Sequence, residues 1–251
     1  MRTCIVIPYF DHFAEFREFL PKLTATGLTL LVVDDATPVD DGDLLAALLA
    51  RDAPGAVLVR RERNGGKGAA VMTGLRAALQ AGFTHAVQID ADGQHDTADL
   101  PTFLETSARH PHSLVCGEPQ FGDDISRLRY YGRFVTLSFS WLETLSTEIR
   151  DALCGFRVYP LAQTISLLDN CKPGKRMAFD PEILVRAVWS GLELRFVPIT
   201  VRYPQGGRSH FRYFGDNAEI AWMHTRLIFG MLLQLPTLVR RRRRATGKAR
   251  A

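Results

Sequence analysis

The chain has 251 residues, of which 46% are hydrophobic and 23% charged, the composition of an ordinary globular protein. Its formal net charge of +4 is unevenly placed, because residues 240–251 hold seven basic side chains and no acidic one. The remaining chain has 24 basic against 27 acidic groups, a net charge of −3, which argues against a nucleic-acid-binding body. Four cysteines without a CxxC spacing argue against a zinc site or a disulfide framework.

The first 120 residues alternate apolar runs of strand length with segments of helical periodicity. This pattern predicts strands at 3–7, 28–33, 56–59, 85–89 and 113–116, and helices at 13–23, 43–51, 68–81 and 98–109. Because the strands are apolar throughout, we expect a parallel sheet covered by helices on both faces. The polar clusters follow the strand ends, where such sheets bind their ligands.

The second half of the chain is less regular. Its pattern predicts helices at 127–148, 181–190 and 216–235, a strand at 193–203 and a loop at 204–207. The last helix leads into the arginine-rich tail.

The segment Asp90-Ala91-Asp92-Gly93-Gln94-His95 follows the predicted strand 85–89. Side chains two positions apart in an extended segment share a face, so Asp90, Asp92 and Gln94 point the same way. Carboxylate and amide oxygens are ligands for Mg²⁺ or Mn²⁺, and magnesium completes its shell with substrate phosphates. The segment therefore predicts a metal site, with His95 as a neighbour; the alternative is a polar turn with a helix cap.

Asn64-Gly65-Gly66-Lys67-Gly68 precedes a predicted helix. Glycines let backbone N–H groups approach an anion at a helix N-terminus, and Lys67 adds a positive charge, so we expect phosphate binding. The spacing fits neither a P-loop nor a dinucleotide fingerprint, and a simple glycine-rich turn is the alternative. Asp34 and Asp35 end another buried strand and are candidates for binding a ribose or a base; helix capping is the alternative.

These clusters, in this order, resemble the family 2 glycosyltransferases with a GT-A fold, and most of all the polyprenyl-phosphate sugar synthases of the dolichol-phosphate mannosyltransferase type. The matching segments are residues 5–8, 33–35, 64–68, 90–95 and 151–157. The resemblance implies an α/β fold with a Rossmann-like, mixed but mostly parallel sheet flanked by helices. We expect a GT-A domain at 1–215, an amphipathic helix at 216–239 and a disordered basic tail at 240–251.

The resemblance also assigns roles to individual residues. It implies Mg²⁺ or Mn²⁺ on Asp90, Asp92 and Gln94, and catalytic roles for Asp92 and Asp151. The residues expected to bind the nucleotide sugar are Pro8, Phe10, Asp34, Asp35, Asn64, Lys67, Gly68 and Asp90. His12 and His210 depart from the family pattern, because an acid and a lysine are usual at those positions.

Arginines in an aromatic stretch are the candidates for binding an acceptor phosphate. Arg127, Arg129 and Arg133 are spaced to gather on one helix face, and a guanidinium grips phosphate with two hydrogen bonds. The residues that we expect to contact the acceptor phosphate are Arg127, Arg133, Arg157, Arg202, Ser209 and His210. The alternative for the helix arginines is a solvated face.

The predicted C-terminal helix is apolar on one side and runs into Arg240–Arg244. An amphipathic helix beside a basic run is typical of an interfacial anchor on anionic membranes. We therefore expect a cytoplasmic protein, peripheral on the inner face of the cell membrane. The alternative is a core-packing helix with a solvated tail.

The function predicted from these features is metal-dependent transfer of a sugar from a nucleotide-sugar donor to a polyprenyl phosphate or similar lipid. The resemblance implies that the reaction inverts the anomeric centre. A phosphate acceptor is already anionic and needs no strong base, whereas a hydroxyl acceptor would need one, for which Asp151 is the candidate. Two alternatives stay open: transfer to a lipid or glycolipid hydroxyl, and a non-catalytic, membrane-associated nucleotide-binding module.

Overall fold

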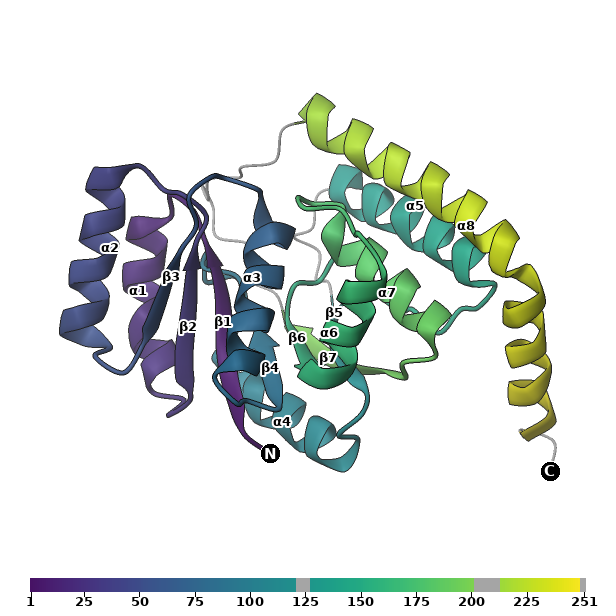
Figure 1. The fold of residues 1–251 in the computed structure, drawn as a ribbon, viewed down its shortest axis with the longest axis horizontal. Helices are drawn as coiled ribbons and strands as arrows, with labels where there is room; N and C mark the ends of the chain where they lie inside the picture. Colours follow the sequence, from purple (N-terminus) through teal and green to yellow (C-terminus); the bar gives the residue numbers. More distant parts are fainter. Residues whose placement is uncertain (121–126, 201–212, 249–251) are drawn as a thin grey trace.

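The computed structural model describes residues 1–120, 127–200 and 213–248. It is built on a seven-stranded sheet in the order β3-β2-β1-β4-β6-β5-β7 (Figure 1). The strands are β1 (Thr3–Tyr9), β2 (Thr29–Asp34), β3 (Val57–Arg60), β4 (His85–Gln88), β5 (Leu114–Gln120), β6 (Arg157–Pro160) and β7 (Leu194–Thr200). The α-helices are α1 (Phe13–Thr24), α2 (Val39–Asp52), α3 (Lys67–Gln80), α4 (Leu100–Arg109), α5 (Arg127–Thr144), α6 (Leu161–Asn170), α7 (Phe179–Ser190) and α8 (Tyr213–Lys248). A short 3-10 helix, Thr97–Asp99, leads into α4.

The sheet is mixed but mostly parallel, as predicted. Strands β1, β2, β3 and β4 run parallel, and β5 is parallel to β7. Only β6, among the described strands, runs the other way, paired antiparallel with both β4 and β5. Because of this reversal, Arg157 at the start of β6 lies opposite Gln88 at the end of β4. The carboxyl ends of β1, β2 and β4 and the beginning of β6 therefore meet at one edge.

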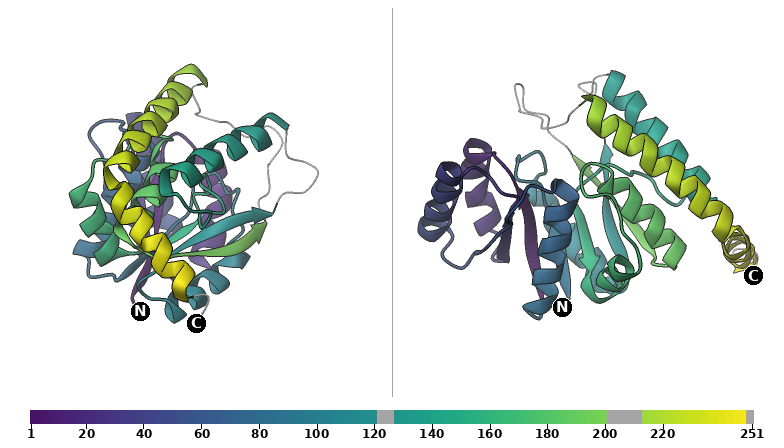
Figure 2. Two further views of the ribbon diagram at one scale, coloured as in Figure 1. Left: turned by 90° about the vertical axis from the view of Figure 1, so that its right-hand side faces the viewer. Right: turned by 45° about the horizontal axis from the view of Figure 1, so that its top comes forward.

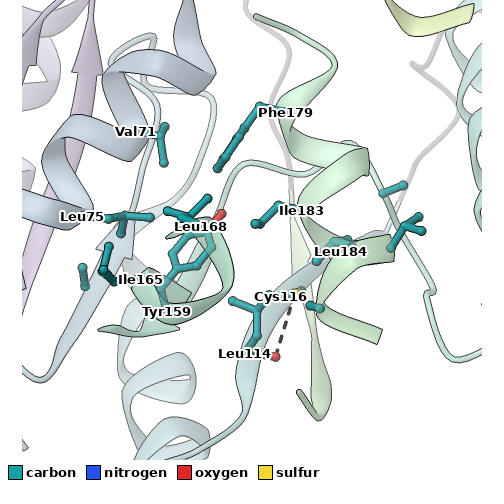
Figure 3. Close-up of a cluster of buried hydrophobic side chains, with 14 of the residues drawn as sticks. Val71, Leu75, Leu114, Cys116, Tyr159, Ile165, Leu168, Phe179, Ile183 and Leu184 are labelled. Atoms are coloured by element: carbon teal, nitrogen blue, oxygen red, sulfur yellow. Dashed lines mark hydrogen bonds between the residues drawn. The ribbon is translucent and has the colours of Figure 1, made fainter. Parts of the chain in front are cut away.

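Helices cover both faces of the sheet, because alternate strand residues point to opposite sides. Ile5 and Ile7 face one core, which α1, α2 and α4 cover; Cys4 and Val6 face the other, beneath α3, α6 and α7. Figure 3 shows the second core, in which Val71 and Leu75 of α3 approach the apolar side chains of α6 and α7.

Helices α5 and α8 lie side by side beyond α7, at the end of the molecule away from α1 and α2 (Figures 1 and 2). The indole of Trp189 in α7 donates to the carbonyl of Glu143 in α5, at 2.9 Å. Between α5 and α8, Nδ1 of His224 lies 2.7 Å from Oε1 of Glu143, and both side chains are buried. Within the described residues, no helix combines the length and the apolar character that crossing a bilayer requires.

The observed elements agree with most of those predicted, and three differences stand out. First, β6 and α6 were not predicted, because Arg157–Pro160 is short and begins with a charged residue. Second, the strand expected at 193–203 is Leu194–Thr200, with 201–203 outside the described residues. Third, α8 continues through Pro236 to Lys248, where we expected a disordered tail from residue 240. Arginine is a good helix former, so a basic run is able to extend an existing helix.

Candidate active site

Lys67 lies between two carboxylates at the carboxyl edge of the sheet. It is the first residue of α3, and its Nζ lies 2.8 Å from Oδ2 of Asp90 and 2.8 Å from Oδ2 of Asp180. Asp90 follows β4, and Asp180 is the second residue of α7. Burial disfavours the ammonium, but the charges of Asp180 and Asp90 outweigh it and raise the pKa of Lys67. Lys67 is therefore a fixed positive charge in the site.

Asp90 and Asp92 differ in their protonation behaviour. Burial favours the neutral form of Asp90, but the positive charge of Lys67 and its hydrogen bond prevail and lower the pKa of Asp90. Burial and the negative charge of Asp90 together raise the pKa of Asp92 to about 6. Two such close carboxylates repel each other, and a bound cation relieves that repulsion. Burial lowers the pKa of His95, which favours the neutral imidazole at neutral pH.

The residues present fit a divalent metal ion that takes part of its coordination shell from a substrate. Oδ1 of Asp90 is buried without a well-formed hydrogen bond from the described residues. Asp92 accepts a hydrogen bond from the backbone N–H of Gln94, at 3.0 Å, which orients its carboxylate. In the described ranges, no three His, Cys, Asp or Glu side chains cluster as a complete metal site. A pair of carboxylates matches magnesium, which is commonly held by one or two carboxylates plus phosphates.

Gly155 leaves the space that this arrangement needs. A Cβ atom at this position would lie 2.7 Å from Oδ2 of Asp90 and 2.7 Å from Nζ of Lys67. Both distances are well below normal contact, so any side chain here displaces the ion pair. Gly155 belongs to the segment 151–157 on which the family resemblance rests.

Asp35 shapes the glycine-rich loop. Its carboxylate accepts hydrogen bonds from the backbone N–H of Gly65 at 3.0 Å and of Gly66 at 2.6 Å, and pairs with Arg61. Gly66 has a φ of +89°, which a residue with a side chain rarely adopts. Asp34 accepts from the N–H of Thr37, at 2.9 Å. Both acids thus have internal partners in this structure, and a direct contact with a nucleotide stays a prediction.

The other residues predicted to bind the donor lie at the same edge. Pro8 is near the end of β1, paired in register with Val33, and Phe10 follows that strand. Asn64 is exposed before α3, and Gly68 is packed against Phe179 of α7. Their position agrees with a donor site. Their contacts with a nucleotide sugar stay a prediction.

On the acceptor side, the structure brings Arg133 and Asp151 together. Nε and Nη2 of Arg133 donate to the two carboxylate oxygens of Asp151, at 2.7 and 2.9 Å. Asp151 also accepts from the backbone N–H of Leu153 and of Cys154. Its role as a base stays a prediction, since every described contact of this carboxylate is that of a structural acceptor.

Arg157 lies elsewhere than expected. Its guanidinium is fully buried and donates to the carbonyls of Cys154 at 2.9 Å and Ala152 at 3.1 Å. Because β6 lies inside the sheet, this position does not fit direct contact with an acceptor phosphate. Arg202, Ser209 and His210 lie outside the described residues, as does the side chain of Arg127.

Sequence reasoning missed Asp180. In the sequence, Asp180 lies between the basic residues Lys175 and Arg176 and a second acid, Glu182, and nothing local marks it as part of the site. Its partner Lys67 is far away in the sequence, so only the fold reveals the ion pair.

An α/β sheet with strand-end acids and a glycine-rich loop at its carboxyl edge has the arrangement in which open α/β sheets bind their ligands. Residues 4–169 match Glycosyl transferase family 2, and the chain belongs to this family. It is a glycosyltransferase with the GT-A fold, as its sequence predicted.

Relatives and a solved structure agree with this assignment. The chain is 29% identical to an undecaprenyl-phosphate mannosyltransferase of Micrococcus luteus, over 80% of this chain and 83% of the relative. It is 27% identical to a polyprenol monophosphomannose synthase of Mycolicibacterium smegmatis, over 79% of this chain and 77% of the relative. Its fold is similar to that of glucosyl-3-phosphoglycerate synthase from Mycobacterium tuberculosis, solved with Mn²⁺ and UDP, with a TM-score of 0.57 and 17% identity over 92% of this chain and 78% of that one.

Proposed function

We propose that this glycosyltransferase uses a divalent metal to move a sugar from a nucleotide-sugar donor to a polyprenyl phosphate. The observation that carries the proposal is the convergence of Asp90, Asp92 and Lys67 at the carboxyl edge of the sheet. Acids and a fixed cation at this edge suit a diphosphate and its metal. The names of the two relatives above supply the class of acceptor.

On the donor side, Asp90 and Asp92 would hold Mg²⁺ or Mn²⁺, with Gln94 as the third predicted ligand. When bound, the metal acts as a Lewis acid toward the diphosphate. Lys67 offsets the negative charge that develops on the leaving nucleoside diphosphate, since it stays protonated at neutral pH. The glycine-rich loop, held by Asp35, presents the N-terminus of α3 to the phosphates.

On the acceptor side, Arg133 is the described residue best suited to a phosphate. Its planar guanidinium already makes a bidentate pair with Asp151, and a phosphate monoester offers the same geometry. The acceptor phosphate is largely ionised at pH 7, so its oxygen attacks the anomeric carbon without a strong base. The family match favours a single displacement with inversion.

Product analysis separates a phosphate acceptor from a hydroxyl acceptor. Purified protein is incubated with a panel of sugar nucleotides, Mn²⁺ and either polyprenyl phosphate or the matching polyprenol, and the lipids are analysed by mass spectrometry. The proposal predicts a sugar phosphodiester from the phosphate alone. A glycoside formed from the polyprenol at an equal or higher rate would contradict it and favour Asp151 as a base.

We further propose that α5 and α8 bind the surface of an anionic membrane. The face would be the inner face of the cell membrane, with the nucleotide-sugar donor supplied from the cytoplasm. Spacings of four and seven residues put Trp222, Phe229 and Leu233 on one face of α8, and all three are exposed. Further exposed apolar side chains are Tyr130, Tyr131, Phe134, Val135, Phe139 and Leu142 on α5 and Phe214, Leu232, Leu235 and Val239 on α8. The helix then continues into the basic run that begins at Arg240.

Liposome sedimentation tests the membrane proposal. Replacing Trp222, Phe229 and Leu233 by Ala together should weaken binding to phosphatidylglycerol vesicles by at least about tenfold, because each side chain contributes on the order of 1.5–3 kcal/mol when buried. Deleting Arg240–Ala251 should weaken the same binding in a salt-dependent way. The Leu44→Ala variant, on the exposed face of α2, is the control. Unchanged binding in both altered proteins would contradict the proposal.

A further inference from the structure

Two carboxylates share the ammonium of Lys67, and only one of them is a predicted metal ligand. Nζ lies at 2.8 Å from both Asp90 and Asp180, while the Lys67 side chain is 18% exposed. Asp180 stands apart from the metal segment 90–94 in the sequence and comes from another element, α7. Its side chain is 5% exposed. The ammonium therefore has a partner that does not depend on Asp90.

Surrounding residues fix the orientation of Asp180. Its Oδ1 lies 3.5 Å from the side-chain amide of Gln88 and 3.7 Å from Nη1 of Arg157. The hydroxyl of Tyr159 in turn donates to Oε1 of Gln88, at 2.9 Å. These contacts hold one oxygen of the carboxylate from behind, so that Oδ2 faces Lys67. This also gives the buried Arg157 a role behind the site.

The second partner of Lys67 becomes important when a metal ion binds to Asp90. A divalent cation on Asp90 repels Lys67 and takes over the carboxylate that the ammonium contacts. With Asp90 as its only partner, Lys67 would be left as an unpaired, mostly buried charge, which is strongly unfavourable. With Asp180 in place, the ammonium keeps one ion pair while Asp90 binds the metal.

We infer that Asp180 is a positioning residue: it retains Lys67 when Asp90 exchanges the ammonium for a divalent cation. The inference rests on the proposed metal site. It predicts that Asp180 affects metal affinity through Lys67 and not through its own charge. Asp180 itself is not expected to bind the metal or the substrate.

A double-mutant cycle with Mn²⁺ alone tests this dependence. The proteins are wild type, Asp180→Asn, Lys67→Met and the double variant, and free Mn²⁺ is measured by electron paramagnetic resonance. Asp180→Asn should weaken Mn²⁺ binding about tenfold in the wild-type background, because Lys67 then competes for Asp90 without a second partner. In the Lys67→Met background the same change should alter the affinity less than about twofold. Asp169→Asn, which removes an exposed partner of Arg76, is the control.

An equal loss in both backgrounds would overturn the inference, because it would show a direct effect of the Asp180 charge. So would unchanged affinity in Asp180→Asn. Absence of Mn²⁺ binding by the wild-type protein would refute the metal site and, with it, this inference. Sugar transfer that a chelator does not inhibit would refute the metal dependence in the proposed function. Failure of the cycle alone, with normal Mn²⁺ binding by wild type, leaves the proposed function intact.

A measurement on wild-type protein covers the case in which Asp180→Asn does not fold. The ammonium of Lys67 is followed by nitrogen-15 NMR during a titration with Mg²⁺ alone. A retained ion pair with Asp180 keeps its protons in slow exchange with water at saturating Mg²⁺. Loss of that protected signal on metal binding would overturn the inference.

Discussion

The guanidinium of Arg133 in α5 holds both carboxylate oxygens of Asp151, at 2.7 and 2.9 Å. This pair joins the helix that carries the exposed aromatic residues to the loop before β6, beside the donor site.

The acceptor role proposed for Arg133 requires its guanidinium to exchange Asp151 for the acceptor phosphate. Arg133→Lys should then raise the KM for polyprenyl phosphate about tenfold, because an ammonium cannot make the bidentate contact. The KM for the donor should stay unchanged. Steady-state kinetics with Arg109→Lys, in an exposed pair on α4, as control measures both; an effect on the donor KM alone would exclude the acceptor role.

Gly155 is expected to tolerate no side chain. Its Cβ would enter the space of the Asp90–Lys67 pair, so Gly155→Ala should reduce sugar transfer by at least about 100-fold, on the order of the loss seen when one preorganised electrostatic group is removed. The matched control is Gly55→Ala, where nothing lies within 4 Å of the added atom. Activity is compared at equal folded fraction, judged by circular dichroism. A Gly155→Ala enzyme as active as the control would contradict the prediction, because it would show that a methyl group fits beside the Asp90–Lys67 pair.

Asp35 should stabilise the protein as well as shape the donor loop. Asp35→Ala leaves the N–H groups of Gly65 and Gly66 without their acceptor, which costs about 1–3 kcal/mol when such groups are buried. Urea unfolding measures this loss, with the exposed Asp52→Ala as control. Affinity for the donor nucleotide should fall in parallel. Wild-type stability with normal donor affinity would mean that the loop keeps its shape without Asp35.

The buried pair between α5 and α8 predicts a pH effect on stability. Burial raises the pKa of Glu143, and the hydrogen bond with His224 only partly opposes this. Since the folded-state pKa is above the unfolded value, Glu143 favours the folded state at low pH, and this contribution is lost as pH rises through the folded pKa. Glu143→Gln keeps the shape and an acceptor for His224 but does not titrate.

The variant should therefore gain in stability relative to wild type as pH rises from the usual glutamate range toward neutrality. Unfolding midpoints of both proteins, measured from pH 4.5 to 8, report this difference. The other charged groups near Glu143 are His224 and Glu182, which both proteins retain. A difference that is constant with pH, or that falls as pH rises, would contradict the assignment.

The parts of the site that are local in sequence were predictable. Asp90 and Asp92 follow an apolar strand, Gly66 precedes helix α3 and Lys67 begins it, so strand ends and helix starts alone placed them at one edge. The fold class followed in the same way from the alternation of strands and helices, and the family match confirmed it.

The parts that depend on long-range pairing were not predictable. Asp180 lies 92 residues after its neighbour Gln88, and only the antiparallel insertion of β6 brings Arg157 behind it. Arg157 was expected at the acceptor and belongs to the segment 151–157 that resembles the family, but its burial follows from the order of the strands in the sheet. The continuation of α8 past Arg240 is different, because it was open to local reasoning: arginine is a good helix former, and the basic run extends a helix that already exists.

The measurement that tests the central claim most directly is sugar transfer to polyprenyl phosphate by wild type and Asp92→Ala, with Mn²⁺ or with excess chelator. Purified wild type should form the sugar phosphodiester with Mn²⁺ and lose this activity on chelation. Asp92→Ala should be slower by at least about 100-fold, because it removes a ligand of the ion that stabilises the leaving diphosphate. Full activity of Asp92→Ala in the presence of excess chelator would contradict the account.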